Sequence, residues 1–484
     1  MKFWLTLSLF LRISWAVAQT TIYQPFEADS AAEPRGGIPF FNTFLQTNLR
    51  KPTAAEAKGE GGRVIVSGIV ETDGRLTDVK LGKTFRPDCD HEALRVFKLF
   101  NAWKPALKGG RPVRQQVTMP ITFKPNTPFI YENGTRTDYF DANNKPLPDS
   151  SRARYKQVSP IDSIGIPTGD AVVYKASKNS WKEEFRLPLV RKENGFRGKS
   201  GKTGYLIGYQ NAISQLDGQL ISVDDRGALL RQAYFKDGKR VGAELIYYSN
   251  GLVAEKIEEF DATTIINSWY MNGQIKQVRT VAKFKPQQVG SPEQVNAYWD
   301  STGHQQIVAG MGRVTYSTRV RSSSDTTQFK LFLEEGAYQN GYKQGVWTGH
   351  YEDGSYFYEE QYEKGICQTG KASTMGGAMT HYTVVQQPPE FIGGMQALGQ
   401  FLSQNLQYPP DAVRARVQGK VFISFVINAE GAVENVRVLK GIGYGADEEA
   451  LRVVKKTNGH WKPGVQRGRK VNTNYNLPIN FNMP

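Results

Sequence analysis

The chain has 484 residues, 39% of them hydrophobic, and is too long to fold around a single core. Its formal net charge of +15 is spread along the chain, which favours attraction to the anionic surfaces of a cell envelope. The sequence holds no motif that reads a nucleic-acid groove, so we exclude nucleic acid as a partner. The two cysteines, Cys89 and Cys367, fall in different predicted domains and exclude a disulfide framework.

The first 18 residues have the pattern of a cleaved secretory signal peptide. A basic start is followed by an apolar run over 3–11 and by the small residues Ala16-Val17-Ala18 at the cleavage site. Arg12 interrupts the apolar run, which is shorter than the roughly 20 residues that a membrane-spanning helix needs. We therefore expect a periplasmic protein, secreted across the inner membrane, that begins with an arm over residues 19–35.

Residues 36–125 have the pattern of a small α+β domain. Apolar periodicity and turn signals predict a helix at 40–49, strands at 64–70 and 76–81 around a turn at 72–74, a helix at 92–100 and a strand at 113–123. Asp90 is the candidate cap of the second helix. The order α-β-β-α-β predicts a small antiparallel sheet with helices on one face.

The middle of the chain is predicted to be mostly β. Residues 126–205 are rich in Pro, Ser, Lys and Asn, and we expect irregular β pieces with long loops there. Over 206–371 a tyrosine-rich strand repeatedly meets an Asn-Gly or Asp-Gly turn, as at Tyr247–Gly251 and Tyr351–Gly354. These turns supply positive φ angles, so the pattern predicts a series of β-hairpins. Residues 372–388 are expected to be a linker.

Residues 389–484 repeat the first domain. Trp103-Lys104-Pro105 matches Trp461-Lys462-Pro463, and Pro120-Ile121 matches Pro478-Ile479. About thirty of roughly ninety aligned positions are identical, which establishes an internal duplication. We call residues 36–125 the first copy and residues 389–484 the second copy.

The second copy has the landmarks Gly393-Gly394, Tyr408-Pro409 and Trp461-Lys462-Pro463. With them it resembles the C-terminal domain of TonB. The first copy resembles it more loosely, because Arg50-Lys51-Pro52 lacks the tyrosine before the proline. The resemblance implies a small sheet with helices on one face, and a periplasmic role in docking onto a short segment of an outer-membrane transporter. The membrane helix and Pro-rich spacer of an energy-transducing TonB are missing, so the resemblance supports binding rather than energy transduction.

Residues 335–365 resemble the MORN repeat, a short β-hairpin unit that stacks in series. The resemblance implies a row of hairpins, and the aromatic residues beside the turns can stack between neighbours. The predicted fold class is therefore two α+β end domains that flank a mostly β hairpin-repeat region.

A proline lies inside the last strand of each copy, at Pro120 and Pro478. Since proline cannot donate a ladder hydrogen bond, we expect this strand at a sheet edge, where an extended partner peptide could add to it. The family resemblance adds the neighbourhood of Tyr408. The predicted partner-binding residues are Tyr408, Pro409, Lys470, Val471, Asn472, Thr473, Asn474, Tyr475 and Asn476. The alternatives are a solvated edge without a partner and an edge that pairs with a second copy of the same domain.

Three features that could carry chemistry are interpreted as structural. Gly441–Gly445 is a lone Gly-x-Gly, and the first copy lacks these glycines, so a turn is the better interpretation. Asp88–Glu92 holds metal-ligand residue types, but the second copy loses the Cys and His while keeping acidic residues that suit a helix N-terminus. The five histidines are scattered. We therefore predict no catalytic residues, no metal and no cofactor.

We expect a periplasmic, non-enzymatic binding protein. Its second copy would pair with an extended segment of a TonB-dependent outer-membrane transporter or of another envelope protein. The alternative is a structural scaffold that binds peptidoglycan or self-associates as a homodimer through its end domains.

Overall fold

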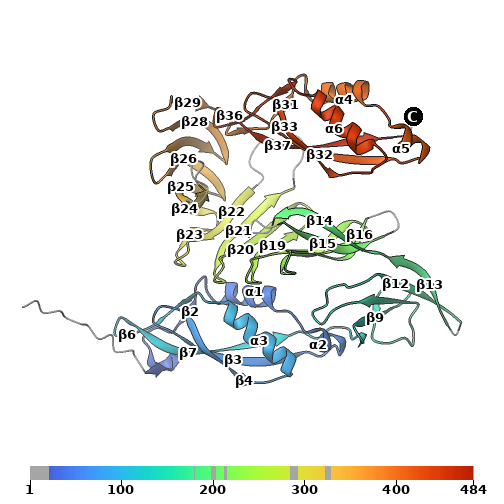
Figure 1. Ribbon diagram of the computed structural model, residues 1–484. Helices are drawn as coiled ribbons and strands as arrows, with labels where there is room; N and C mark the ends of the chain where they lie inside the picture. The colour runs from blue at the N-terminus through green and yellow to red at the C-terminus, as the bar shows by residue number, and fades with distance from the viewer. Residues whose placement is uncertain are drawn as a thin grey trace, which may run out of the picture. The chain divides into compact units, whose positions relative to one another are not determined.

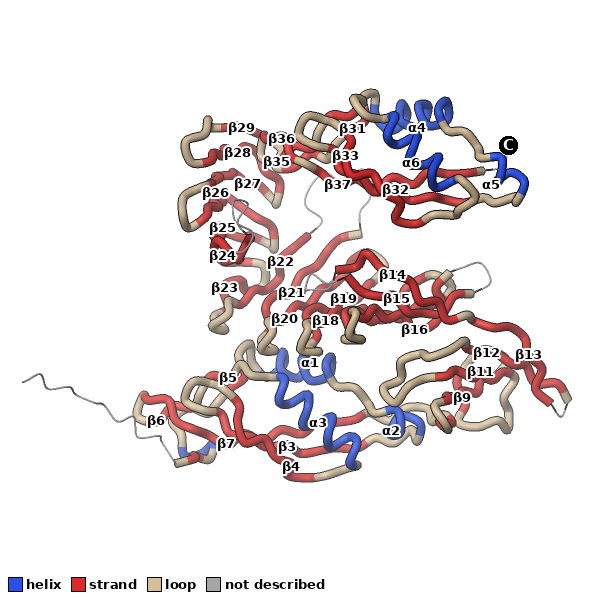
Figure 2. The backbone as a smooth tube through the Cα atoms, in the orientation of Figure 1, coloured by secondary structure: helices blue, strands red, loops and turns tan. Residues whose placement is uncertain are grey.

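The computed structural model describes residues 21–178, 180–197, 203–211, 215–283, 293–321 and 329–482 (Figure 1). The expected signal peptide, residues 1–18, lies outside them. The chain divides into two compact units: the first holds the residues up to 284 with 295–308, and the second holds 285–294 with 309–484. The structure is mostly strand, which agrees with the expectation of α+β end domains that flank a β-rich middle. The α-helices of the described residues lie only in the first and second copies (Figure 2).

The first copy and the arm before it form one α+β domain. Its elements are β1 (Ile22–Tyr23), a 3-10 helix η1 (Pro25–Glu27), β2 (Glu33–Pro34), α1 (Ile38–Asn48), α2 (Thr53–Ala57), β3 (Gly62–Val70), β4 (Leu76–Lys83), α3 (Pro87–Leu99), β5 (Trp103–Lys104), β6 (Ala106–Lys108) and β7 (Arg111–Phe123). The sheet has the order β1-β7-β3-β4, with β6 also paired to β7. The short helix α2 was not expected.

The core of the first copy is aromatic. Phe41, Phe44, Leu45 and Asn48 are the buried residues of α1, at the spacing of one helix face. The ring of Trp103, which is 1% exposed, meets those of Phe41, Phe97 and Phe100 at centroid distances of 5.4, 6.3 and 5.6 Å. Trp103 is therefore a core residue, which leaves it no surface for a partner.

The second copy repeats this architecture. Its elements are β30 (Gln386–Gln387), β31 (Glu390–Phe391), α4 (Gly394–Asn405), α5 (Pro410–Arg414), β32 (Gly419–Ile427), β33 (Val433–Lys440), α6 (Ala446–Lys456), β34 (Trp461–Lys462), β35 (Gly464–Gln466), β36 (Arg469–Val471) and β37 (Thr473–Phe481). The main sheet has the order β33-β32-β37. Phe425, Val453 and Trp461 belong to its core.

The expected role of Asp90 was wrong. Helix α3 begins at Pro87, with Arg86 at its N-cap, so Asp90 lies within the helix. Its Oδ1 accepts the backbone N–H of Phe85, 2.9 Å away. In the second copy Asp447 does the same for the N–H of Ile442 at 2.8 Å. The conserved carboxylate thus holds the loop before the helix, a pairing of side chain and backbone that helix spacing alone does not reveal.

The middle of the chain folds into two sets of strands. Strands β8 (Ile130–Glu132), β9 (Thr135–Phe140), β10 (Pro146–Leu147), β11 (Tyr155–Pro160), β12 (Ala171–Ser177) and β13 (Ser180–Leu187) form one sheet. The hairpin strands follow and pair in chain order. In the first unit these are β14 (Leu189–Arg197), β15 (Thr203–Gln210), β16 (Leu216–Val223), β17 (Leu229–Lys236), β18 (Lys239–Tyr247), β19 (Val253–Glu259), β20 (Thr263–Trp269), β21 (Ile275–Ala282), β22 (Glu293–Trp299) and β23 (Gln305–Val308).

The second unit continues with the same kind of strand. Its hairpin strands are β24 (Met311–Arg321), β25 (Phe329–Gln339), β26 (Tyr342–Tyr351), β27 (Tyr356–Glu363), β28 (Ile366–Thr374) and β29 (Thr380–Tyr382). The segment 372–388, expected to be a linker, contains the end of β28, all of β29 and β30. Its glycines form a tight turn, in which Gly377 donates its N–H to Thr374 O at 2.8 Å. The glycines of this segment therefore form a turn between β28 and β29 rather than the flexible linker that was expected.

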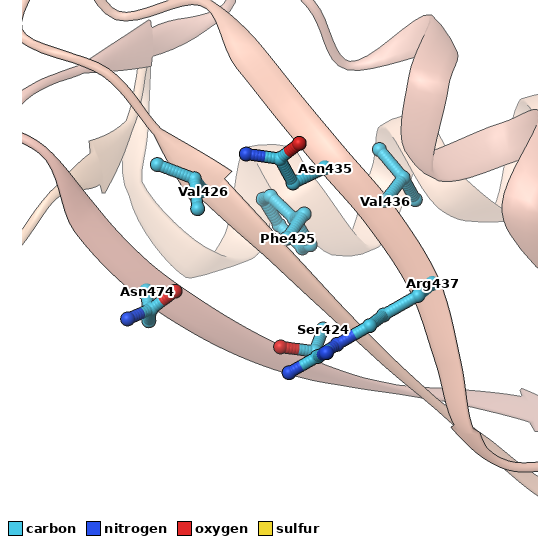
Figure 3. Close-up of a pocket in the computed structure, with 7 residues that line it drawn as sticks. All are labelled: Ser424, Phe425, Val426, Asn435, Val436, Arg437 and Asn474. Carbon is cyan, nitrogen blue, oxygen red and sulfur yellow. The ribbon is translucent and has the colours of Figure 1, made fainter.

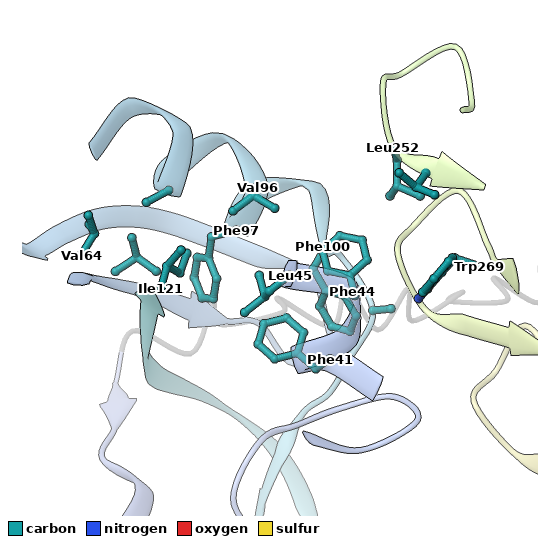
Figure 4. Packing of buried hydrophobic residues seen from close by; sticks show 14 of the residues in the cluster. Phe41, Phe44, Leu45, Val64, Val96, Phe97, Phe100, Ile121, Leu252 and Trp269 are labelled. Atoms are coloured by element: carbon teal, nitrogen blue, oxygen red, sulfur yellow. The ribbon is translucent and has the colours of Figure 1, made fainter. Parts of the chain in front are cut away.

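Three hairpin turns of the first unit pack against α1. Their glycines are Gly251, Gly273 and Gly303, each with a positive φ. A Cβ on Gly273 would lie 2.9 Å from the Phe44 ring, and one on Gly303 would lie 2.9 Å from Arg35. Such close approach requires glycine. Figure 4 shows Leu252 and Trp269, which flank two of these turns, beside Phe44 and Phe100 in one continuous core.

Polar contacts fix the helix on the turns. Asn48 is buried, donates from Nδ2 to Phe44 O at 3.0 Å and accepts the N–H of Val253 on Oδ1 at 2.8 Å. Asn405, at the same place in the second copy, keeps the helical bond to Phe401 O at 2.9 Å. The two asparagines therefore differ by one contact to a hairpin, which makes them a matched pair.

Replacing Asn48 by Ala should weaken the contact between α1 and the turns, because the buried Val253 N–H would lose its acceptor at a cost of about 1–3 kcal/mol. Hydrogen exchange followed by mass spectrometry should show faster exchange in a peptide that contains Val253. Asn405→Ala is the control, because it removes the helical bond alone. Equal effects of the two changes on overall stability, with Val253 unaffected, would contradict this account.

A buried ion pair joins the second copy to the hairpins of its own unit. Glu360 on β27 is 1% exposed, and it accepts from Arg467 Nε at 2.7 Å. Its other donors are the hydroxyls of Tyr382 at 2.8 Å and Tyr362 at 3.0 Å. Burial by itself lowers the pKa of Arg467, but the hydrogen bond and charge of Glu360 outweigh burial and raise it. The ion pair fixes the start of the chain segment that leads into β37.

Arg467→Met should destabilise the second unit by about 3–5 kcal/mol, because it leaves a buried carboxylate without its counter-charge. Adding Glu360→Gln should restore part of the loss. Urea unfolding followed by hydrogen exchange in β27 and β35 would measure both. Arg469→Met is the control, since Arg469 donates to the neutral Thr374 hydroxyl at 3.1 Å. If Arg467→Met lowers the free energy of unfolding no more than Arg469→Met does, the role of the ion pair is refuted.

Candidate edge-strand binding site

The last strand of the second copy lies at the edge of its sheet. Strand β37 pairs with β32 in a continuous antiparallel register from Thr473↔Ile427 to Phe481↔Gly419. On its other side no strand of the described residues is paired with it. Exposed residues alternate with half-buried or buried ones along the strand, so Asn474, Asn476 and Pro478 share the exposed face.

The proline shows which backbone groups of β37 point outward. Residues of an antiparallel strand alternate between facing the paired strand and facing away from it. Pro478 has no N–H, so it suits a position that faces away from β32. Asn476 and Asn474 lie two and four residues before it and therefore face away as well. Thr473 and Tyr475 face β32, so the outward donors and acceptors belong to the asparagines.

In the first copy the corresponding edge is occupied. Strand β1 pairs in parallel with β7, with Ile22 opposite Arg114 and Tyr23 opposite Gln115. Arg114 precedes Pro120 by the same six residues that separate Asn472 from Pro478. The arm of this chain therefore adds to β7 as an extra strand at the place that matches the start of the open edge in the second copy.

The matching segment before the second copy takes another course. Residues Thr380–Tyr382 form β29 and pair with β28 of the hairpins, with Tyr382 opposite Gly370. From Gln387 onward the two copies agree again: Gln387 pairs with Val465 as Ser30 bridges Leu107. Within the segments that precede the two domains, the chain paths thus diverge at the few residues that would cover the edge.

The predicted site residues do not all come together. Lys470, Val471, Asn472, Thr473, Asn474, Tyr475 and Asn476 are consecutive along β36 and β37. Tyr408 instead packs its ring on Phe481, at 5.7 Å and edge to face, and its hydroxyl donates to Val417 O. Pro409 is the N-cap of α5. Phe481 lies six residues beyond Tyr475, or about 20 Å at the rise of a strand. Tyr408 and Pro409 therefore border the far end of the strand.

A shallow groove of about 510 Å³ adjoins the edge. It is lined by Ser424, Phe425, Val426, Asn435, Val436, Arg437 and Asn474 (Figure 3). The groove lies where a bulge between Ser424 and Val426 shifts the register of β32 against β33. Figure 3 shows the Arg437 side chain extended across Ser424, its register partner. A peptide on the edge would therefore find a polar hollow with one positive charge beside Asn474.

Ion pairs and hydrogen bonds fix the surroundings of the edge. Glu449 accepts the N–H of Gln407 at 2.7 Å and pairs with Arg452 at 2.6 Å. Burial alone would raise the pKa of Glu449, but the bonds from Arg452 and Gln407 hold it below its usual range. Asn472 accepts the Ala429 N–H on Oδ1 at 2.9 Å, so its side chain ties the strand to the turn after β32. The residue that precedes β37 is therefore held in place by this hydrogen bond.

The groups considered for chemistry have structural partners. Asp88 pairs with Arg86 at 3.0 Å, and Cys89 is buried, which raises the pKa of its thiol to about 11. Gly443 has a positive φ and open space around it, as a turn requires. Within the described part of the chain, no three His, Cys, Asp or Glu residues gather as metal ligands would. In that same part, no helix has the length and apolar character needed to cross a membrane.

The pairing of the arm with β7 was missed by sequence reasoning. The arm forms only two residues of strand, Ile22 and Tyr23, which is too short for a periodic pattern. The internal duplication could have indicated that the arm has its own role. The aligned segments before the two copies differ, although the domains behind them match, and this difference marks a segment with a separate role.

Comparison with known families agrees with the duplication. Residues 48–125 and 404–483 each match the family model described as Gram-negative bacterial TonB protein C-terminal. No curated protein matches the chain. Two segments of this chain, one in each copy, are therefore similar to the C-terminal domain of TonB proteins.

Proposed function

We propose that this chain is a periplasmic, non-enzymatic binding protein. In this proposal the outward backbone groups of β37 pair with an extended segment of a TonB-dependent outer-membrane transporter or of another envelope protein. The observation that carries the proposal is the contrast between the copies: the first has an extended segment on its edge, and the second has the same edge without one among the described residues. The family match of both segments supports the transporter as partner.

The geometry favours a weak and reversible contact. Three or four backbone hydrogen bonds at about 0.5–1.5 kcal/mol each give only a few kcal/mol before side chains contribute. The exposed asparagines keep the edge polar, which discourages uncontrolled pairing. Arg437 and Asn474 in the adjacent groove offer polar contacts to the partner's side chains.

A structural scaffold is the second candidate. The hairpins of the second unit support it, because Gly336, Gly349 and Gly370 each make room for an aromatic ring, from Trp347, Tyr358 and Tyr382. We propose that these stacked hairpins are of the MORN type. In this alternative they and the basic surface hold the protein on peptidoglycan, and the open edges of two molecules pair to form a homodimer.

The outward direction of Asn474 can be tested without a partner. Asn474→Pro should leave the domain nearly as stable as before, because it removes an N–H that faces solvent. Thr473→Pro should cost about 1–3 kcal/mol, because the lost N–H faces β32 and leaves the acceptor of Ile427 unpaired. Thermal unfolding of the two variants would measure the difference. The reverse order of stabilities would refute the assigned directions.

Affinity capture from the native envelope tests the function. The wild type and Asn474→Ala, which keeps the backbone N–H, should capture outer-membrane transporters, and Asn474→Pro should lose them. Because the two substitutions remove the same side chain, the comparison isolates the backbone bond. Transporters captured equally by all three proteins would end the proposal. Retention of peptidoglycan with no transporter would favour the scaffold.

A further inference from the structure

We propose that the edge of the first copy is a second peptide-binding site, kept closed by the chain's own arm. The segment 22–27 stands in for a peptide ligand there, and an external extended peptide of similar character binds when the segment is released. This inference rests on the proposed function, because it assumes that edge pairing is the mode of binding. It goes further by assigning a latent site to the first copy and a closing segment to the arm.

A buried glutamine of β7 and a lysine of β6 hold the arm. Gln115 of β7 is 0% exposed and serves both parts of the arm. Its Oε1 accepts the Ala32 N–H at 2.6 Å, and its Nε2 donates to Gln24 O at 3.5 Å. The Lys108 ammonium lies 4.6 Å from the centre of the Tyr23 ring. One buried amide of β7 thus bonds the backbone of both parts of the arm.

The two parts of the arm are bound with different firmness. The later part is tied to Leu107 by three backbone hydrogen bonds: the N–H groups of Asp29 and Ser30 donate to Leu107 O at 2.8 and 3.2 Å, and the Leu107 N–H donates to Ser30 O at 2.9 Å. The earlier part packs lightly: Ile22 is 40% exposed and Phe26 is 85% exposed. The segment 22–27 can therefore leave β7 while the rest of the arm stays in place.

The second copy keeps only one of the two parts of the arm. There the later part is kept, as the pairing of Gln387 with Val465 shows, and the earlier part is used in β29 instead. At the position of Gln115 the second copy has Thr473, whose hydroxyl donates to Val471 O at 3.3 Å. The buried amide that binds the arm is thus present only where an arm is bound. The domain itself folds with its edge either covered or open.

The covalent link between the segment 22–27 and the first copy favours this segment over an external peptide. A segment joined to its site by a short linker acts at an effective concentration of about millimolar. An external peptide at micromolar concentration therefore cannot displace the arm unless the arm is weakened. The ligand expected at the released site is an extended segment that runs parallel to β7, with an aliphatic and an aromatic residue in succession like Ile22-Tyr23.

The probe for the test is a fluorescein-labelled peptide with the sequence of residues 20–29. All proteins in this test carry Asn474→Pro, which blocks the edge of the second copy. Binding of the probe therefore reports on the first copy alone, and failure of the proposed function at β37 is detected separately by the affinity capture. Neighbouring residues of a strand point their N–H groups to opposite sides, so one of Ile22 and Tyr23 donates towards β7. Ile22→Pro with Tyr23→Pro removes that N–H whichever residue carries it. Fluorescence anisotropy should show at least tenfold tighter binding of the probe by this released protein than by its parent.

Two variants locate the bound probe. Arg114→Pro in the released protein should abolish binding, because it removes the N–H of the β7 residue that lies opposite Ile22 of the arm. Arg114 lies beyond the pairing of β7 with β3, so the change leaves that ladder intact. Arg114→Ala keeps the N–H while it removes the ion pair with Glu71, so it should still bind. Failure of the folded released protein to bind the probe, or binding that survives Arg114→Pro, would overturn the proposal.

Hydrogen exchange on the unaltered chain gives an independent measurement. The amides of residues 22–27 should exchange faster than those of the β3–β7 ladder, because the segment opens without global unfolding. Exchange of the arm as slow as that of the ladder would overturn the proposal even if the released variants did not fold.

Discussion

The structure depends on one constraint, which is that a strand at the edge of a sheet has half of its backbone donors and acceptors without a partner in that sheet. Both copies end in such a strand, and both place a proline in it where the missing N–H costs nothing. The first copy meets the constraint with its own arm. The second copy leaves the groups to solvent and covers the strand with asparagines. The proposed binding rests on that difference.

The duplication shows how two domains with one scaffold acquired different contacts. Residues that serve the domain itself are kept, such as Asn48 and Asn405, each of which bonds the carbonyl four residues earlier in its helix. Other residues, which attach a copy to the hairpins of its unit, differ between the two copies. Arg35 and Phe40, which contact the hairpin turns, correspond to Ile392 and Ala397. Arg467, which joins the second copy to Glu360, corresponds to Gly109. Each copy is therefore attached to the hairpins of its own unit through a different face.

The sequence was informative where a pattern repeats and uninformative where a contact is unique. Helical spacing and the strand prolines located α1, α3 and β7, because burial and ladder pairing impose a period on the residues. The short helices α2 and α5, with five residues each, are too brief for a period. The bond from Asp90 to the Phe85 N–H and the pairing of the arm with β7 depend on tertiary placement. Tyr408 was grouped with Asn474 through family resemblance, whereas the strand separates them.

The covered edge of the first copy has a consequence for assembly. If the last strands of both copies were open, each molecule could pair through two of them, and repeated pairing of that kind builds a filament. With one of the two covered, a molecule has a valence of one for pairing through its last strands. Ile22 and Tyr23, which cover β7, therefore limit growth by this mode, although β4 and β33 are also edge strands of their sheets.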